Sequence, residues 1–312
     1  MARYYAGRGV SIEADRILLT ASTSEAYGFV FKLLADPGDV ILVPQPSYPL
    51  FEFLAELEGV GAQPYPLRYG DAGWEVDVDR LAAAITERSR AIVLVHPNNP
   101  TGSFVRRHEA DAINALAREC GLALIVDEVF GDYGMAPDPG RADTFADEAD
   151  LLTFTLSGLS KVLGLPQLKL SWAVVQGPDA ERVEALARVE LIADTYLSVA
   201  APIQVALPEL MDLRTEIQGQ IRIRTQANLS LLQERTASVH KAEVLRCDGG
   251  WYAVLEVDGD EEELTLALLQ RDDVLAHPGY FFDFARESYI VLSLLSPEFE
   301  VGVERLLGRV QG

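Results

Sequence analysis

Short apolar runs that alternate with longer amphipathic stretches are the feature that most constrains how this chain can fold. Most of the runs are rich in Val, Ile and Leu without polar alternation, which is typical of parallel strands covered on both faces. We expect strands at 40–43, 62–66, 91–95, 122–126, 151–156 and 171–175. We expect helices between them, at 24–34, 48–57, 79–87 and 106–119. This order predicts an α/β fold with a mostly parallel sheet sandwiched by helices.

The pattern changes in the last third of the chain. Residues 209–237 have the spacing of one long helix. Its buried stripe would consist of Leu210, Leu213, Ile217 and Ile221. Beyond it we expect two strands and a helix, at 250–256, 288–294 and 261–270. We therefore divide the chain into a large domain, 1–208, and a smaller α+β C-terminal domain, 209–312, which includes the long linking helix.

Composition excludes several classes of protein. The net charge of −22, from 26 basic and 48 acidic residues, argues against a surface for nucleic acid or for an anionic membrane. The chain shows no apolar run of bilayer-spanning length and no apolar N-terminal segment, so we expect a cytoplasmic protein. Two cysteines and four histidines without ligand spacing give no reason to expect a metal site.

Three polar residues follow predicted strands, where open α/β sheets bind ligands. Asn99 lies in a turn directly after 91–95, Asp127 ends the run at 122–127, and Lys161 follows 151–156. A lysine amine can form a Schiff base with an aldehyde cofactor, and a carboxylate can hold a pyridine nitrogen protonated. Together they indicate pyridoxal 5′-phosphate (PLP). The Asn99 turn alone has a structural alternative, because Asn, Pro and Gly are ordinary turn residues.

A polar turn before the first predicted helix suggests where a phosphate would bind. Residues 19–27 read as strand, turn and helix start, and a helix N-terminus offers free backbone amides to an anion. Ser22, Thr23 and Ser24 lie at this point. The alternative is a plain N-cap, in which Ser22 or Thr23 serves only the helix.

Five motifs in this order carry a family resemblance. They are LLADPGDV at 33–40, PQPSYP at 44–49, NNPTG at 98–102, DEVF at 127–130 and SGLSK at 157–161. With them the chain resembles the class I/II aminotransferases, PLP-dependent enzymes with the aspartate aminotransferase fold (fold type I). The resemblance covers roughly 16–177 and continues more loosely through 276–279 and 289–293. Taken jointly, the motifs are highly specific.

The resemblance assigns roles to individual residues. Lys161 would form the Schiff base and move the proton at the substrate Cα, and Asp127 would pair with the pyridinium nitrogen. Asn99 would contact the 3-oxygen of the cofactor and Tyr48 would stack on its ring. The phosphate would be held by Ser22, Thr23 and Ser24, with Lys169 in the place of the family's arginine. The cofactor-binding residues it implies are Ser22, Thr23, Ser24, Tyr48, Asn99, Asp127, Phe130, Ser160, Lys161 and Lys169.

The chain also departs from the family pattern. Phe130 stands where many members have a tyrosine, and Gly158 where a phosphate-contacting Ser or Thr is common, with Ser160 or Ser157 as substitutes. Val291 stands where members carry the arginine that binds the substrate α-carboxylate, and Arg286 is the nearest basic candidate. Members also have several dozen residues before the equivalent of Tyr4, including an N-terminal arm that this chain lacks.

The resemblance implies a PLP-dependent aminotransferase that moves an amino group between an amino acid or related amine and a 2-oxo acid. One alternative is a PLP-dependent lyase or another non-transaminase. Another is a truncated PLP-binding protein with little activity. Because the family's site lies between two subunits, we expect a homodimer. Because the preceding segment is missing, we expect it to bind PLP but to transaminate poorly, unless an upstream start codon restores the arm. Nucleic acid and membrane are not expected as partners.

Overall fold

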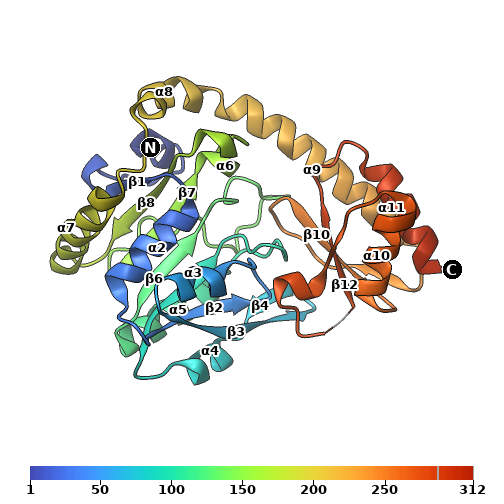
Figure 1. Cartoon of the computed structure of the whole chain (residues 1–312), viewed down its shortest axis with the longest axis horizontal. Coiled ribbons are helices and arrows are strands. Elements are labelled where there is room, and N and C mark those ends of the chain that lie inside the picture. The colour runs from blue at the N-terminus through green and yellow to red at the C-terminus, as the bar shows by residue number, and fades with distance from the viewer. Residues whose placement is uncertain (287, 312) are drawn as a thin grey trace.

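The computed structural model describes residues 1–286 and 288–311. Within them the chain builds an eight-stranded sheet from its first 176 residues and a four-stranded sheet from residues 242–293. Figure 1 shows these two bodies side by side, with the long helix α9 (Arg214–Thr236) running along their upper edge from one to the other. The N-terminus lies on the first body and the C-terminus on the second.

The large sheet has the strand order β1-β8-β7-β6-β5-β2-β3-β4. Its strands are β1 (Ile17–Thr20), β2 (Val40–Gln45), β3 (Gly61–Gly70), β4 (Gly73–Val76), β5 (Ser89–Val95), β6 (Ala123–Asp127), β7 (Thr153–Gly158) and β8 (Ser171–Gln176). The five strands from β7 to β3 are parallel, whereas β8 is antiparallel to β7 and β1, and β4 to β3. All six strands expected from 40 to 175 are present, and the mostly parallel α/β sheet is confirmed.

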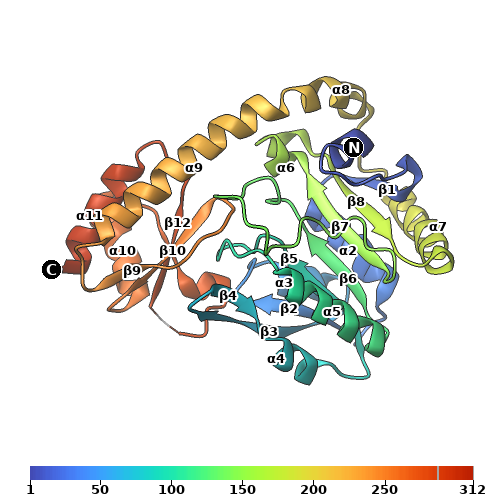
Figure 2. The same ribbon diagram turned by 180° about the vertical axis from the view of Figure 1, so that it is seen from behind.

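Helices cover both faces of this sheet. They are α1 (Ala2–Ala6), α2 (Thr23–Leu34), α3 (Phe51–Leu57), α4 (Val78–Ala84), α5 (Arg107–Cys120), α6 (Leu159–Val162), α7 (Asp179–Tyr196) and α8 (Ala201–Asp212). Side chains of α2, α3 and α7 pack on one face, and those of α4 and α5 on the other. The first group is in front in Figure 1, and α5 is in front in Figure 2.

The alternation of side chains along β6 decides which face of the sheet its last, polar residue points to. Ala123 and Ile125 pack with α2, while Leu124 and Val126 pack with α5 on the opposite face. Both sets are apolar because both faces are covered, which explains the continuous apolar run in the sequence. Successive side chains in a strand point to opposite faces, so Asp127 continues the α2 side.

The four-stranded sheet is antiparallel, in the order β11-β12-β10-β9. Its elements are β9 (Ala242–Val244), β10 (Tyr252–Val257), α10 (Glu261–Asp272), β11 (His277–Pro278), β12 (Tyr289–Ser293) and α11 (Phe299–Gln311). Leu229 and Leu232 of α9 join its core. The predicted α+β character of the C-terminal region is therefore confirmed.

The expectation of one helix over 209–237 is wrong. Helix α8 ends at Asp212 and α9 begins at Arg214, and Leu213 between them is half exposed rather than part of a buried stripe. Leu210 of α8 and Ile217 of α9 both pack against the first body, and α9 then reaches the core of the second body at Leu232. The break lets each helix bury its own apolar face.

Among the described residues, no single helix combines the length and the apolar composition needed to cross a bilayer. The pair α7 and α8 reaches both together, but the two helices are bent by 117° at the break between them.

Candidate active site

Asp127 ends β6 and is held from two sides. Tyr27 of α2 donates its hydroxyl to Asp127 Oδ2 at 3.2 Å, and the backbone amide of Val129 donates to Oδ1 at 3.0 Å. Burial raises the pKa of Asp127 to about 6, while the two hydrogen bonds and the charge of Lys161 act against that rise. A buried carboxylate of this kind is stabilised by a cation placed next to it.

Lys161 lies in α6, the short helix that follows β7. Burial lowers the pKa of its amine, with only Asp127 acting in the opposite direction. The Nζ atom is 5.3 Å from the ring centre of Phe130 and 5.0 Å from that of Trp251. Tyr133 donates its hydroxyl to the Lys161 carbonyl at 2.6 Å and so fixes the helix turn. A shielded amine with a lowered pKa is the form in which lysine acts as a nucleophile.

The residues of the turn after β5 have two kinds of role: some hold the loop together, and Asn99 does not. Asn98 donates its amide to Ser47 Oγ at 2.9 Å and accepts from the Thr101 hydroxyl at 3.0 Å. Gly102 has φ +71°, and a Cβ there would lie 2.5 Å from the Gly249 carbonyl oxygen. These residues build the loop. Asn99 Oδ1, in contrast, is buried without a hydrogen-bond partner in the described part of the chain.

At the start of α2 the structure supports the N-cap alternative for Ser22. Ser22 Oγ accepts from the backbone amide of Glu25 at 3.1 Å, so this hydroxyl serves the helix. Thr23 and Ser24 are the first two helical residues, whose amides have no acceptor within the helix. The Ser24 hydroxyl is hydrogen-bonded to Tyr48, which brings the predicted phosphate cradle next to the predicted stacking residue.

The remaining predicted phosphate ligands lie around α6. Lys169 is exposed, in a left-handed conformation with φ 51°, after the short turn that follows α6. Gly158 leaves no room for a side chain, because a Cβ there would overlap the hydroxyl of Ser171 on the neighbouring strand β8. Ser157 Oγ is buried and finds no partner among the described residues, and Ser160 is half-buried. Ser171 therefore occupies the space that a side chain at position 158 would need.

The second body contributes two aromatic residues that the sequence did not indicate. Trp251 packs edge-on against Phe130, with ring centres 5.3 Å apart, and Tyr252 lies 6.3 Å from the same ring. The indole nitrogen of Trp251 is buried and has no acceptor within the described residues. These contacts join β10 to residues about 120 positions earlier, so no local pattern could reveal them.

The two residues considered for the substrate carboxylate lie elsewhere. Val291 of β12 is fully buried in an apolar cluster with Trp74 and Phe284. Arg286 is largely exposed and pairs with Glu256, with an Nη2–Oε1 distance of 3.1 Å. Its guanidinium therefore already has a partner on β10.

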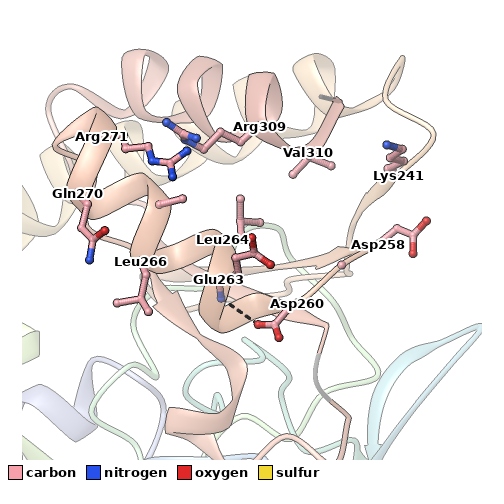
Figure 3. A pocket seen from close by; sticks show the side chains of 12 residues that line it. Lys241, Asp258, Asp260, Glu263, Leu264, Leu266, Gln270, Arg271, Arg309 and Val310 are labelled. Atoms are coloured by element: carbon pink, nitrogen blue, oxygen red, sulfur yellow. Dashed lines mark hydrogen bonds between the residues drawn. The ribbon is translucent and has the colours of Figure 1, made fainter.

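A groove of about 480 Å³ on the second body is unrelated to these residues. It lies beside α10 and α11 (Figure 3) and contains none of the residues predicted to bind the cofactor. Two of its polar side chains have structural partners: Asp260 accepts from the Glu263 amide at 2.9 Å, and Arg309 pairs with Asp272.

The residues around Asp127 and Lys161 fit PLP. A buried acid suits a protonated ring nitrogen, and a shielded amine suits an aldehyde. Three buried polar atoms without partners in the described chain lie on the segments that meet here, namely Asn99 Oδ1, Ser157 Oγ and Trp251 Nε1. Buried polar atoms without hydrogen bonds are costly, so they favour a polar ligand that would satisfy them.

Comparison with known proteins also points to the aminotransferases. The family model "Aminotransferase class I and II" matches residues 1–301. An alanine aminotransferase of Mycobacterium tuberculosis is 26% identical over 306 residues, spanning 94% of this chain and 70% of that protein. The glutamate-pyruvate aminotransferase AlaA of Escherichia coli is 27% identical over 293 residues, spanning 90% and 71%.

Solved structures agree in fold. An alanine aminotransferase from Pyrococcus furiosus superposes with a TM-score of 0.88 at 24% identity, covering 99% of this chain and 79% of its own. The N-succinyldiaminopimelate aminotransferase of Mycobacterium tuberculosis gives 0.85 at 25% identity, covering 98% and 82%. Nothing in these comparisons favours the lyase alternative. The chain belongs to the class I and II aminotransferases and is a PLP-dependent transferase of nitrogenous groups that acts on amino and 2-oxo acids.

Proposed function

We propose that Lys161 and Asp127 are the catalytic residues of this aminotransferase. The observation that carries the proposal is the buried Asp127 carboxylate, held by Tyr27 and the Val129 amide, whose pKa the charge of Lys161 lowers against the effect of burial. Such a carboxylate needs a positive partner, and the ring nitrogen of PLP would supply one. When bound, PLP supplies an aldehyde carbon for the amino group and a ring that accepts electrons.

The chain's own residues would divide the remaining work. Lys161 Nζ would take the proton from the substrate Cα and return it, which its lowered pKa favours. Asp127 would hold the proton on the ring nitrogen. Phe130 and Trp251, whose rings lie beside Nζ, would exclude water from it.

The binding roles proposed for the other residues rest on their positions. Tyr48 would stack on the ring, and Asn99, with its unpaired amide oxygen, would contact the 3-oxygen. The phosphate would meet the free amides of Thr23 and Ser24, with Lys169 as its cation. The fuller set of proposed ligands is Ser22, Thr23, Ser24, Tyr48, Asn99, Asp127, Phe130, Ser160, Lys161 and Lys169, to which we add Ser171.

For the substrates we propose an amino acid donor and a 2-oxo acid acceptor, with glutamate and pyruvate as the first pair to try because of the relatives' names. Val291 leaves the substrate carboxylate without the family's usual arginine. We propose that other groups hold it, or that it is held weakly.

We also propose a homodimer, with residues 1–208 as the large domain and 209–312 as the small one. Helices α7 and α8 expose large apolar side chains that a second copy would cover, since contiguous apolar surface marks interaction sites. These side chains are Val183, Leu191, Tyr196, Leu197 and Val205. The sedimentation mass of the purified protein tests the dimer. The cytoplasmic location and the low activity expected from the sequence stay predictions.

The direct test of the catalytic proposal compares Asp127→Asn with wild type in the half-reaction with glutamate, followed by the cofactor's absorbance. We expect a loss on the order of a hundredfold or more, because an uncharged partner no longer holds the ring nitrogen protonated. Asp39→Asn is the matched control. Asp39, just before β2, is as buried as Asp127, at 7% exposed, and pairs with Arg90 of β5. Wild-type rates in Asp127→Asn would overturn the proposal.

A further inference from the structure

Trp251 of the second body brings a hydrogen-bond donor next to Lys161. Its indole is 6% exposed, and the Nε1 atom has no acceptor within the described part of the chain. Lys161 Nζ lies 5.0 Å from the centre of the indole ring. A buried N–H group without an acceptor is costly, so a donor left in this state favours a ligand that accepts from it.

Contacts between the two bodies hold the indole in this position. Gly250 donates its amide to the Tyr133 carbonyl at 2.9 Å. The rings of Phe130 and Tyr133 pack edge-on against the indole, with ring centres 5.3 and 5.0 Å away. Tyr133 also donates its hydroxyl to the Lys161 carbonyl at 2.6 Å. Tyr133 therefore ties the segment of Trp251 to the helix of Lys161, and it fixes the donor relative to the amine.

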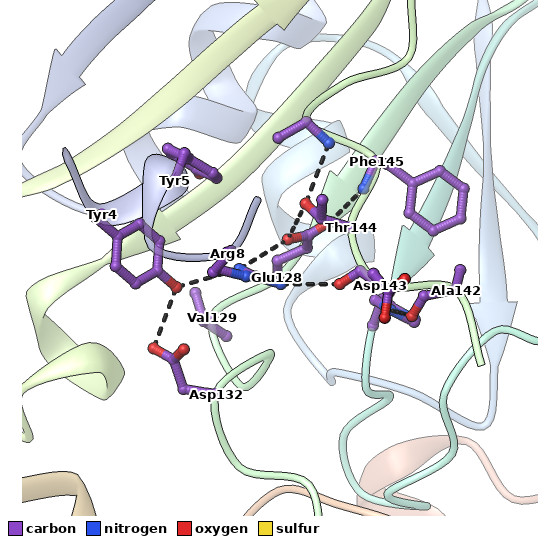
Figure 4. Close-up of polar contacts among 12 residues, drawn as sticks. Tyr4, Tyr5, Arg8, Glu128, Val129, Asp132, Ala142, Asp143, Thr144 and Phe145 are labelled. Atoms are coloured by element: carbon purple, nitrogen blue, oxygen red, sulfur yellow. Dashed lines mark hydrogen bonds and ion pairs between the residues drawn. The ribbon is translucent and has the colours of Figure 1, made fainter. Parts of the chain in front are cut away.

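The acidic side chains of the segment that follows β6 already have other partners. Asp127 accepts from a tyrosine hydroxyl and a backbone amide. Figure 4 shows Glu128 paired with Arg8, at 3.3 Å between Oε2 and Nη1, and Asp132 accepting from the Tyr4 hydroxyl at 3.1 Å. None of the three carboxylates takes the hydrogen bond that the indole offers, so this donor is left for a ligand.

The covalent structure of PLP decides which of its acceptors lies nearest to such a donor. The 3-oxygen and the aldehyde carbon are attached to adjacent ring atoms, so a lysine nitrogen joined to that carbon lies beside the 3-oxygen. A donor next to Lys161 Nζ is therefore also next to this oxygen. Phe130, which packs against Trp251, has no hydroxyl and offers no hydrogen bond there.

We propose that Trp251 is a cofactor-binding residue whose indole N–H donates a hydrogen bond to the 3-oxygen of PLP. This inference rests on the proposed attachment of the cofactor to Lys161. It gives the second body a direct contact with the cofactor, and it supplies the donor that Phe130 lacks. A fixed donor that is shielded from water stabilises negative charge on the oxygen that it meets.

This hydrogen bond should control how readily the nitrogen of the bound cofactor takes a proton. A proton on that nitrogen neutralises the charge of the neighbouring 3-oxygen, whereas without it the charge depends on donors from the protein. The indole therefore favours the unprotonated form and keeps the pH midpoint low. Burial raises the pKa of the tyrosines near this position, so they stay uncharged at neutral pH and Asp127 is the acid that faces Lys161. These tyrosines are Tyr27, Tyr48, Tyr133 and Tyr252.

The test follows the visible band of the lysine-bound cofactor against pH, without substrate. Trp251→Phe keeps an aromatic ring but removes the donor, so the midpoint should rise by about one pH unit. Adding Phe130→Tyr to this variant returns a hydroxyl beside Nζ and should bring the midpoint back toward wild type. Trp74→Phe is the matched control and should leave the midpoint in place. The Trp74 indole is 7% exposed and likewise unpaired among the described residues, but it packs on Tyr69 and Phe284.

An unmoved midpoint in Trp251→Phe would overturn the inference, and so would an equal shift in Trp74→Phe. The inference also fails if the midpoint stays while Trp251→Phe weakens binding of an amino acid more than binding of its decarboxylated amine. The indole would then serve the substrate carboxylate instead. Failure of the proposed function looks different: wild type would show no visible band, or the band would persist in Lys161→Ala.

Should Trp251→Phe not fold, NMR of wild type with isotope-labelled tryptophan decides. The chain has three tryptophans, and Trp172 already donates its indole N–H to the Tyr5 hydroxyl at 2.9 Å. Trp74→Phe and Trp172→Phe assign two of the three indole signals. The third should move downfield when PLP binds, and its position should titrate with the visible band. A third signal that PLP leaves unchanged would contradict the hydrogen bond.

Discussion

Tyr27→Phe removes one hydroxyl from the fully buried side chain that donates to Asp127. A hydrogen bond to a charged group contributes about 1.5–3 kcal/mol, and one pKa unit corresponds to about 1.4 kcal/mol. The lost donor favoured the ionised form, so the pKa of Asp127, already raised to about 6 by burial, should rise by about one to two units. Asp127 must be ionised to act, and activity should therefore disappear at a higher pH on the acid side.

The assay is the pH profile of the single-turnover rate with glutamate. In Tyr27→Phe we expect the acid limb to move upward by about one pH unit or more, while the rate well above it stays near wild type. Tyr65→Phe is the matched control, because Tyr65 is equally buried and donates its hydroxyl to the Val93 carbonyl at 2.6 Å, away from the carboxylate. It should lose stability without moving the profile.

An acid limb that is unchanged in Tyr27→Phe would refute the reasoning. So would an equal shift in Tyr65→Phe, because the effect would then come from general loosening of the sheet rather than from the lost donor.

Three further predictions concern stability. The pKa of Asp127 is about 6 in the folded protein, against an ordinary value of 3.8. The free energy of unfolding of the cofactor-free protein should therefore fall by up to about 3 kcal/mol as pH rises through this window. Asp127→Asn should abolish that fall in denaturant titrations. Val291→Arg should destabilise the protein by at least about 3 kcal/mol, since it would place a charge in an apolar cluster. It should not improve glutamate binding, and a gain in affinity would contradict this. Gly158→Ala should cost about 2 kcal/mol through its overlap with Ser171, and a second change, Ser171→Gly, should relieve that loss of stability. A neutral Gly158→Ala would argue against the overlap.

Periodicity was enough to predict the large sheet. Strands buried on both faces read as continuous apolar runs, and β5 and β6 show why, since alternate residues such as Ile92 and Val93 enter different cores. The same reasoning could not give the direction of β8, because an apolar run looks alike in parallel and antiparallel strands. Nor could it find the break at Leu213, where one helix ends and the next begins in a stretch that looks continuous in sequence.

The candidate site could be proposed from sequence where a single motif contains the residue, as at Lys161 and Asp127. Its supporting residues come from distant segments: Tyr27 lies 100 positions from Asp127, and Trp251 comes from the other body of the molecule. Ser171, which we add to the proposed ligands, lies beside Gly158 only through strand pairing. Arg8 looks like an ordinary basic residue near a chain end, and only the fold brings it to Glu128. Such contacts depend on tertiary packing and leave no local pattern.

The most direct measurement of the central claim is the visible spectrum of purified protein with PLP, followed by borohydride reduction and peptide mapping. Wild type should show the band of a lysine-bound cofactor and carry the reduced adduct on Lys161, whereas Lys161→Ala should show neither. Lys169→Ala, a loss of the neighbouring lysine, should keep the band but bind PLP more weakly. A visible band in Lys161→Ala, or an adduct mapped to another lysine in wild type, would contradict the account.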